Sequence, residues 1–386
     1  MKTPFQDPSQ TPQVSTASSE GVIRSCGKQR VLKGALKIAL CAILLLVARL
    51  LRADEFADRA AELVRDNGGS LFVVEDKDGA GSGFICAIGG KTFAITNQHV
   101  LAGHQGATLT LLNRKPLKMG QAAAAVGHDI MSIAVVSDAK VLEVMPNVER
   151  NATIGDAVAV LGNAEGAQVI KPFVGKLVGI GPNLVEVSAE FVPGNSGSPI
   201  IHLKSGKVIG VATYATIRAI DSLTGTKAPA IRRFGYRLDS VKQWQPVNWN
   251  KYNEEFQMMQ KIAAHTLEFA MLLRAFQFDR TAGFATANRS AQGVTDPAIV
   301  APLQRYAVAL NLRPFLNTKP RPITKSERSD AVKDLLAAIR PLSQRDIVQA
   351  NTRIQYDFFR HSFTEEQSLR EDFYKALVEI LNAPGR

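Results

Sequence analysis

The sequence predicts a β-rich domain followed by an α-helical region. Between residues 70 and 238, short runs rich in Val, Ile, Phe and Thr alternate with Gly, Asn and Asp turns, which is typical of antiparallel barrels or a sandwich. After Pro246, apolar residues recur at spacings of three, four or seven, the pattern of amphipathic helices. A chain of 386 residues also exceeds the usual size of one hydrophobic core, so two folded domains are expected.

The first 53 residues have the features of an export leader. Residues 38–48 form an uncharged apolar run behind two lysines, and its length fits the apolar part of a secretory signal better than a membrane span. Ala53 is the predicted cleavage point, and a start at Val31 would give a signal peptide of ordinary proportions. The alternative is an uncleaved membrane anchor through residues 34–51. Both interpretations export the rest of the chain, to the periplasm or as a secreted protein.

The β-rich domain is assigned to residues 54–247. Its predicted strands are the runs SLFVVED, GSGFICAI, KTFAITN, ATLTLLN, DIMSIAVVS, DAVAVLGN, LVEVSAEF, SPIIHL, KVIGVATYA and RFGYRL. Residues 239–245 are expected to form a closing helix.

The helical region is assigned to residues 248–386. Its predicted helices cover 253–276, 295–310 and 326–341, with a last helix striped by Leu369, Phe373, Leu377 and Ile380. His265 falls on the apolar stripe of the first helix and is expected in the core. Striped helices expose too much apolar surface to be a linker, so they should pack together or on the barrels. The region could regulate activity, dock a partner or only stabilise the fold, and the sequence does not distinguish these roles.

Composition and cysteine usage exclude several function classes. The net charge of +11 comes largely from the first 53 residues, and the remainder has no dense Lys/Arg run, so nucleic-acid binding is not expected. Beyond that leader the only cysteine is Cys86. One cysteine makes neither an intrachain disulfide nor a metal cluster, and no cofactor is expected. Cys86 lies in an apolar run, which predicts a buried, inert thiol.

The stretch FVPGNSGSPII, residues 191–201, places six small or turn-forming residues between two apolar anchors. A hairpin loop is the simplest interpretation. The alternative is a backbone bent tightly enough to present one serine hydroxyl and to aim neighbouring N–H groups at one point. A serine such as Ser196 becomes a nucleophile only when a base removes its proton and a third group holds that base.

Two other residues stand in settings that suit those roles. Among six histidines, His99 follows a β run at the point where polar residues begin, and Asp129 opens an apolar strand. Asp156 is the rival carboxylate, although a Gly–Asp pair before a strand is more often turn chemistry. The order His99, Asp129, Ser196 is that of the chymotrypsin fold and not of α/β-hydrolases, which argues against an esterase of that second class.

Together these segments resemble the chymotrypsin-clan (trypsin-like) serine proteases, and most of all the exported bacterial HtrA/Deg proteases. The matching segments are GSGFI (81–85), TNQHVLAG (96–103), DIMSIAVV (129–136), GDAVAVLGN (155–163), PGNSGSPII (193–201) and GKVIGVAT (206–213). They cover about half of the chain. Ser198 departs from the glycine of most relatives and is similar to bacterial glutamyl endopeptidases. Relatives usually continue into PDZ domains, whereas no PDZ domain is recognisable here.

The resemblance implies two six-stranded antiparallel β-barrels with a triad in the cleft between them. It implies His99 as general base, Asp129 as its orienting partner and Ser196 as nucleophile. The N–H groups of Gly194 and Ser196 would form the oxyanion hole. The implied activity is that of an exported serine endopeptidase acting on protein or peptide substrates through an acyl-enzyme. A catalytically silent trypsin-fold binding or chaperone-like module is the alternative.

The substrate pocket is predicted from the same resemblance. Glu190, six residues before the nucleophile, should lie near the floor of the pocket for the side chain that precedes the cut. Thr213 to Ala215 should pair with the substrate backbone and form a wall, with Tyr214 flanking it. A carboxylate on that floor would favour cleavage after Lys or Arg. Alternatively, strand alternation turns Glu190 outward and leaves a small apolar pocket. Neither the natural substrate nor the oligomeric state is indicated.

Overall fold

The structure is a computed structural model that describes most of the chain beyond the leader. The described residues are 55–76, 79–103, 107–138, 140–164, 169–218, 230–278, 294–311 and 321–383. The predicted leader, its cleavage point and the alternative anchor lie outside these ranges. In the described part of the chain, no helix has the length and apolar character needed to cross a membrane. The elements below belong to one compact unit that begins at Arg59.

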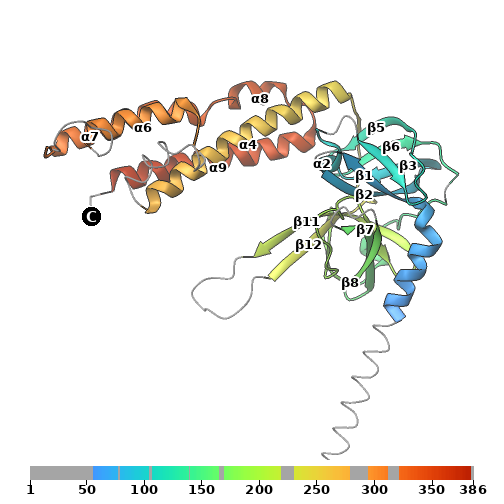
Figure 1. The fold of residues 1–386 in the computed structure, drawn as a ribbon. Coiled ribbons are helices and arrows are strands. Elements are labelled where there is room, and N and C mark those ends of the chain that lie inside the picture. The colour runs from blue at the N-terminus through green and yellow to red at the C-terminus, as the bar shows by residue number, and fades with distance from the viewer. Residues whose placement is uncertain are drawn as a thin grey trace, which may run out of the picture. The chain divides into compact units, whose positions relative to one another are not determined.

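The first β layer is an antiparallel sheet of seven strands in the order β13-β5-β6-β3-β2-β1-β4 (Figure 1). A short 3₁₀ helix, η1 (Gly68–Ser70), leads into it. The strands are β1 (Leu71–Asp76), β2 (Gly79–Ile88), β3 (Lys91–Thr96), β4 (Thr108–Leu111), β5 (Met119–Ala125), β6 (Met131–Val135) and β13 (Trp244–Pro246). Among the described residues, no strand pairing joins β13 to β4. This layer is therefore a half-barrel sheet and not the closed six-stranded barrel that was expected.

The seventh strand also corrects the helix expected at residues 239–245. Those residues instead make a turn and then enter β13, where Trp244 pairs with Ala125. The exposed edge of β5 explains the difference, because its backbone groups need partners that a helix would not supply. Pro246 pairs with Ala123 at the end of this edge strand, a position where a missing N–H is tolerated.

The second β layer is a closed barrel in the order β10-β11-β12-β9-β8-β7. Its strands are β7 (Ala157–Asn163), β8 (Ile170–Ile180), β9 (Leu184–Val187), β10 (Pro199–His202), β11 (Lys207–Arg218) and β12 (Ala230–Tyr236). Alternate residues such as Val158 and Val160 fill its interior, as period-two strands require. The predicted six-stranded second barrel is confirmed, and so is the mainly β class followed by helices.

Cys86 lies inside the first sheet with no exposed surface and no disulfide. Burial raises the pKa of its thiol to about 12, because the thiolate cannot be solvated there. The prediction of an inert, buried cysteine is confirmed.

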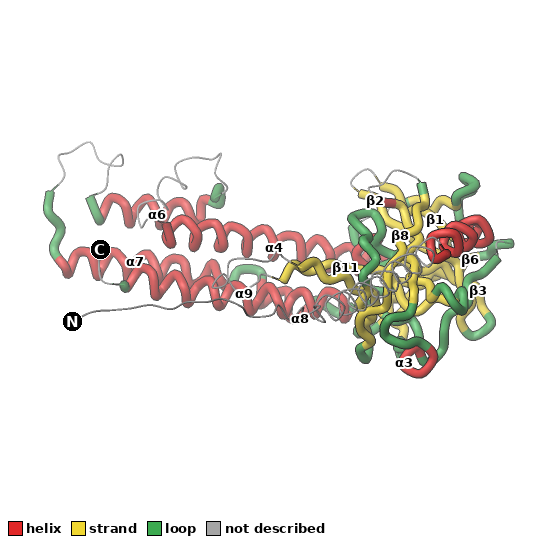
Figure 2. The backbone as a smooth tube through the Cα atoms, turned by 90° about the horizontal axis from the view of Figure 1, so that it is seen from below, coloured by secondary structure: helices red, strands yellow, loops and turns green. Residues whose placement is uncertain are grey.

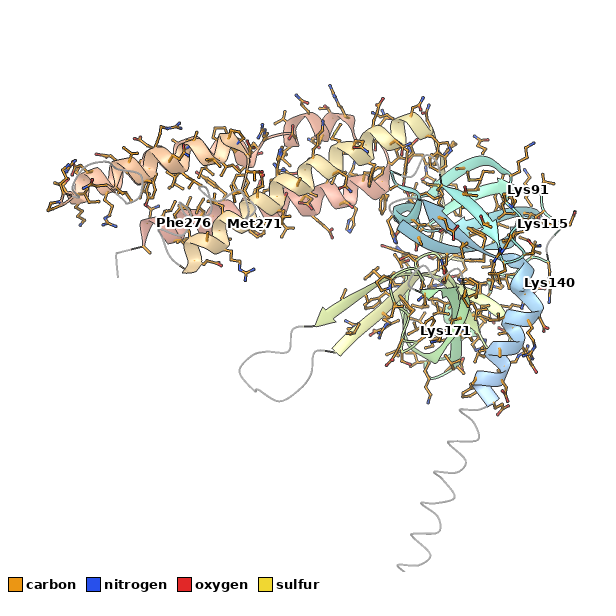
Figure 3. The ribbon with its side chains drawn as sticks, in the orientation of Figure 1. Lys91, Lys115, Lys140, Lys171, Met271 and Phe276 are labelled. Atoms are coloured by element: carbon orange, nitrogen blue, oxygen red, sulfur yellow. The ribbon has the colours of Figure 1, made fainter. Side chains whose placement is uncertain are left out.

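The helical region contains four longer helices and one short one among the described residues. They are α4 (Trp249–Phe278), α6 (Pro297–Ala309), α7 (Lys325–Ser343), α8 (Ile347–Arg353) and α9 (Asp357–Asn382). Helices α4 and α9 run alongside one another, and α6 packs on α7 (Figure 2). Met271 and Phe276, in the second half of α4 (Figure 3), belong to the core that these helices share.

The ends of these helices follow capping chemistry. Asp296 caps α6 by accepting the N–H of Ala298 at 2.9 Å, with Pro297 in the first turn as expected. Helix α7 begins earlier than predicted, because Thr324 and Glu327 form a capping box. It also runs past Pro341 to Ser343, since a proline in the last turn removes only one intrahelical bond.

Two expectations for the helical interior were wrong. His265 is half-buried rather than in the core, with its Nδ1 3.0 Å from Asp346 Oδ2. Leu369 is exposed, whereas Leu377 of the predicted stripe is buried together with Phe363 and Arg370, which were not predicted. The Arg370 guanidinium is tolerated inside because it donates to the Thr266 hydroxyl at 2.9 Å and to two backbone carbonyls.

The helices also pack against the first β sheet, as their apolar stripes require. A single hydrophobic core combines sheet residues such as Phe72, Ile85 and Ile133 with Tyr252, Ile262, Phe359 and Phe363 of α4 and α9. Polar contacts fix this packing: the Tyr252 hydroxyl lies 3.3 Å from Gln98 Oε1, and the Gly127 N–H donates to Asp357 Oδ2 at 2.7 Å. The start of α9 is thus tied to the loop that precedes Asp129.

Candidate active site

His99 is delivered by the end of a buried strand. β3 ends at Thr96, and Asn97 then caps the short helix α2 (Gln98–Leu101), which carries His99 in its first turn. Asn97 is completely buried, and its Nδ2 donates to the backbone carbonyl of Asp129 at 2.6 Å. Gln98 Nε2 donates to the carbonyl of His128 at 2.8 Å. The residues before His99 therefore tie its backbone to the segment that holds Asp129.

Asp129 contacts His99 through both of its carboxylate oxygens. Oδ2 lies 2.5 Å from His99 Nδ1, and Oδ1 accepts the backbone N–H of His99 at 3.0 Å. The Asp129 side chain is 9% exposed, whereas the imidazole is 40% exposed. This geometry orients the ring with Nδ1 toward the carboxylate and leaves Nε2 for a ligand.

The electrostatics of this pair favour a charged imidazole. Burial lowers the pKa of His99, but the negative charge of Asp129 and its hydrogen bond act in the opposite direction and prevail. The pKa of His99 therefore lies above its ordinary value. A base with a raised pKa accepts a proton more readily, as proton abstraction from a hydroxyl requires.

The Ser196 loop is held in a conformation that needs glycine. Gly194 has a φ of 90° and Gly197 a φ of 88°, in the region that L side chains rarely adopt. A Cβ on Gly197 would lie 2.0 Å from the backbone oxygen of Ser82 and 2.4 Å from Thr96 Oγ1. The loop therefore passes too close to the first sheet for any other residue at this position.

Ser82 clamps this loop from the facing sheet. Its hydroxyl donates to the Gly194 carbonyl at 2.8 Å, and its N–H donates to the Ser196 carbonyl at 2.8 Å. The sequence analysis missed Ser82, and also Asn97. Ser82 follows Gly81 in the segment GSGFI, and Asn97 lies two residues before His99 in the segment TNQHVLAG. Their positions inside these two matching segments were the available signal.

Two N–H groups of the loop remain available for a ligand. The N–H groups of Asn195, Gly197 and Ser198 are used by the carbonyls of Val192, Ala212 and Asn195. In the described part of the chain, the N–H groups of Gly194 and Ser196 have no such acceptor. These are the two donors that the sequence predicts for an oxyanion.

The Ser196 hydroxyl lies at the junction of the two β layers. Its Oγ donates to the backbone carbonyl of Thr213 at 3.3 Å. The Thr213 hydroxyl in turn accepts from Asn97 Nδ2 at 3.0 Å, and Asn97 holds the backbone of Asp129. The structure thus brings His99 and Asp129 into direct contact and connects Ser196 to them through Thr213 and Asn97.

The rival carboxylate Asp156 lies elsewhere. Its Oδ2 is 3.1 Å from Nε2 of His202, a buried residue of β10, and it also accepts the N–H of Thr153. Asp156 therefore belongs to a contact within the second barrel. Among the described residues, no group of three or more His, Cys, Asp or Glu side chains is arranged to hold a metal ion.

A cleft of about 800 Å³ opens beside His99 and Asp129. Thr213, Tyr214 and Tyr236 line it from the second barrel, and residues of α9 line it from the helical region. Tyr214 is exposed and stacks on Phe234 with 5.2 Å between ring centroids. The cleft thus combines an aromatic wall with the imidazole.

The predicted pocket residues differ in how they are placed. Thr213 is buried, whereas Tyr214 and Ala215 are exposed along β11. The Glu190 side chain is exposed and its neighbour Ala189 is fully buried, in the segment that follows β9 (Leu184–Val187), so Glu190 faces solvent and not the barrel interior. This is the orientation of the alternative with a small apolar pocket. The role of Glu190 in specificity stays a prediction.

Part of the chain matches a known protein family. Residues 81–211 match the family described as "Trypsin-like peptidase domain", and this range contains His99, Asp129 and Ser196. This segment is a trypsin-like peptidase domain. The "Serine protease Do-like HtrB" of Bacillus subtilis (strain 168) is 30% identical to this chain over 144 residues, which cover 31% of this chain and 29% of the relative. The chain therefore matches less than a third of that relative's length.

Solved structures similar to the trypsin-like peptidase domain include HtrA-type proteases. The serine endoprotease from Yersinia pestis is 20% identical, with a TM-score of 0.38, over 46% of this chain and 62% of that chain. The HtrA-type protease AlgW with a tripeptide is 19% identical, with a TM-score of 0.38, over 47% and 60%. Both likenesses cover less than half of this chain.

Proposed function

We propose that this protein is an exported serine endopeptidase that hydrolyses peptide bonds in protein or peptide substrates. The observation that carries the proposal is the contact of His99 with both carboxylate oxygens of Asp129, beside the glycine-dependent Ser196 loop of a trypsin-like peptidase domain. Export rests on the apolar run at residues 38–48, either as a signal cleaved near Ala53 or as an anchor.

On this proposal, each of these groups has one role in the mechanism. Ser196 Oγ turns from the Thr213 carbonyl to His99 Nε2, which takes its proton as Oγ attacks the substrate carbonyl carbon. Asp129 holds the Nδ1–H and stabilises the imidazolium that forms. His99 then gives the proton to the leaving amine, and an acyl-enzyme remains on Ser196. Water, deprotonated by His99, hydrolyses this ester and frees the serine.

Charge develops on the substrate oxygen during both steps. The N–H groups of Gly194 and Ser196 are positioned by the positive φ of Gly194 and by the Ser82 clamp. Loss of one such donor costs on the order of 10²–10³ in rate. On the same proposal, Thr213 to Ala215 pair with the substrate backbone. The variant Glu190→Ala then tests whether the Glu190 carboxylate favours cleavage after basic residues.

A second candidate function is a catalytically silent binding or chaperone-like module with the trypsin fold. The observation that favours it is the hydrogen bond of Ser196 Oγ to the Thr213 carbonyl at 3.3 Å, in place of a bond to the imidazole. The two functions differ in the reactivity of Ser196, because only an activated serine reacts rapidly with an electrophilic phosphorus.

Covalent labelling separates these functions. We expect a fluorophosphonate probe to label the full chain and peptides to be cleaved. Ser196→Ala should abolish both while the circular dichroism spectrum and melting temperature stay unchanged, because Ser196 is half-buried and removal of its hydroxyl opens no core cavity. Ser368→Ala, at an exposed serine of α9, is the matched control and should keep full labelling. Wild-type protein that neither labels nor cleaves would favour the silent module.

A further inference from the structure

We propose that the first turns of α9 form one wall of the substrate cleft and select peptides that carry Lys or Arg a few residues before the cleaved bond. This inference rests on the proposed function and adds a substrate preference to it. It assigns a role to the helical region, which has no part in the chemistry proposed for the trypsin-like peptidase domain.

The cleft beside His99 has walls from two parts of the chain. His99, His128, Tyr214 and Tyr236 line one side, and Asp357, Phe358, Arg360, His361, Ser362, Thr364 and Glu365 of α9 line the other. The α9 residues therefore line the same cleft as the imidazole and the aromatic residues. A peptide bound at His99 would contact it.

Hydrogen bonds on both flanks hold this wall in place. Gly127, which lies two residues before Asp129, donates its N–H to Asp357 Oδ2 at 2.7 Å. The buried Glu255 of α4 accepts the N–H of Gln355 at 3.0 Å and that of Tyr356 at 3.1 Å. The start of α9 is thus fixed to the triad-bearing segment on one side and to α4 on the other. A rigid wall of this kind can discriminate between side chains.

The path of a bound peptide leads along this wall. If the substrate backbone pairs with Thr213 to Ala215, the residues before the cut extend along β11 past the exposed ring of Tyr214. An extended chain advances about 3.3 Å per residue. Residues two to four positions before the cut therefore lie between Tyr214 and α9, where their side chains meet the groups of both walls.

The charge of the cleft favours a cation in that position. Its lining carries three carboxylates, Asp129, Asp357 and Glu365, and one guanidinium, that of Arg360. It also carries three histidines, of which His99 contacts Asp129 and His361 contacts Glu365. The Arg360 guanidinium donates through Nη2 to the Ile354 carbonyl, which engages part of its hydrogen-bonding capacity.

Glu365 is the carboxylate that remains available to a ligand. Asp129 and Asp357 are engaged by His99 and Gly127, whereas the Glu365 side chain is 66% exposed, with His361 Nε2 at 3.4 Å. The pKa of Tyr236 is raised to about 12, first by burial and then by negative charges that include Asp129 and Glu365. A substrate Lys or Arg here would meet Glu365 and the face of Tyr214, a ring that attracts cations.

The test compares peptides that differ only at the third residue before the cut, with Arg, Gln or Glu there. We expect wild type to have its highest kcat/KM on the Arg peptide. Glu365→Lys should lower the ratio of kcat/KM for the Arg peptide to that for the Glu peptide about two- to fivefold, the size expected for an exposed charge pair. Glu371→Lys, at an exposed position of the same helix outside the cleft lining, should leave the ratio unchanged, and Glu365→Gln should give an intermediate value.

A binding measurement keeps this test separate from catalysis. The same peptides, carrying a fluorophore, are titrated by anisotropy against the Ser196→Ala protein and against the double variant that combines Ser196→Ala with Glu365→Lys. If fluorophosphonate labels the protein but Glu365→Lys leaves the ratio of kcat/KM for the Arg and Glu peptides unchanged, the inference is overturned and the proposed function stands. If the probe does not label the protein but binding is charge-selective and Glu365→Lys abolishes that selectivity, the proposed peptidase function would be overturned and the charge preference of the cleft supported. Equal binding and cleavage of the Arg and Glu peptides by wild type would also refute the inference.

Discussion

The two β layers each contain a histidine–aspartate pair, and the pairs are built in opposite ways. At the first sheet, Asp129 is 9% exposed and its partner His99 is 40% exposed. In the second barrel, His202 is 4% exposed and its partner Asp156 is 32% exposed. The carboxylate is the buried member in one pair and the imidazole in the other. The distances also differ, 2.5 Å against 3.1 Å.

This contrast separates a pair that can act on a ligand from one that supports the fold. A buried carboxylate orients a ring whose other nitrogen faces a cleft, as His99 does. A buried imidazole has no route to a substrate, and both ring nitrogens of His202 are engaged, by Asp156 and by the hydroxyl of Ser205 at 2.9 Å. Proximity of a histidine to an aspartate is therefore a weak sign of catalysis, and the exposure of the imidazole is the stronger one.

Replacing each histidine by alanine gives the largest expected difference between the pairs. His99→Ala should lower kcat by a factor on the order of 10⁴ or more, because the general base is lost, and should leave the melting temperature nearly unchanged. His202→Ala should retain kcat and lower the free energy of unfolding by about 1–3 kcal/mol, because buried polar partners lose their hydrogen bonds. Peptide hydrolysis and urea denaturation measure the two effects. The reverse pattern would remove the distinction.

Replacing each aspartate by asparagine tests the orienting role. Asp129→Asn should lower kcat on the order of 10³–10⁴-fold, somewhat less than the loss of His99, since the amide can hold the wrong tautomer of the ring. Asp156→Asn is the matched control and should change kcat by less than about twofold, because Asp156 contacts His202 of the second barrel and not His99. Equal losses of kcat in both variants would show that neither aspartate is specific to catalysis.

The local patterns of the sequence predicted much of the fold and of the site. Strand alternation identifies the β class. The sequence settings also indicated His99 and Asp129, which are in direct contact in the structure, and Ser196, which is connected to them through Thr213 and Asn97. These predictions succeed because they depend on short-range features, namely the period of a strand and the glycine content of one loop.

Features that depend on distant partners were missed. β13 is a strand only because the edge of β5 needs a partner, and nothing in residues 239–246 indicates that edge. The contact of Gly127 with Asp357 joins residues 230 positions apart, so the wall that α9 contributes to the cleft has no local signal. Arg370 likewise breaks the apolar stripe of α9, because its hydrogen-bond partners come from α4 and the segment before α8.

The smallest expected effect concerns the proton affinity of the exposed imidazole. The pKa of His99 is raised above the ordinary value of about 6.5, because the Asp129 charge outweighs burial. Since catalysis needs neutral His99, the acid limb of kcat/KM should have its midpoint above that value. The free energy of unfolding depends on pH in the opposite direction. The contribution of the charged His99–Asp129 pair is fully present below the pKa of His99 in the unfolded chain, and it is lost as the pH rises through the pKa of His99 in the folded protein.

Nuclear magnetic resonance of the His99 ring in a Ser196→Ala background measures this proton affinity without turnover. Adding Asp129→Asn removes the charge and leaves burial, which lowers the pKa of a histidine, so the midpoint should fall below about 6.5. Adding Asp156→Asn instead should leave the His99 midpoint where it was, because that carboxylate contacts His202. If the midpoint moved equally in both variants, or stayed unchanged with Asp129→Asn, the buried carboxylate would not be what sets the basicity of His99, and the contrast between the two pairs would rest on exposure alone.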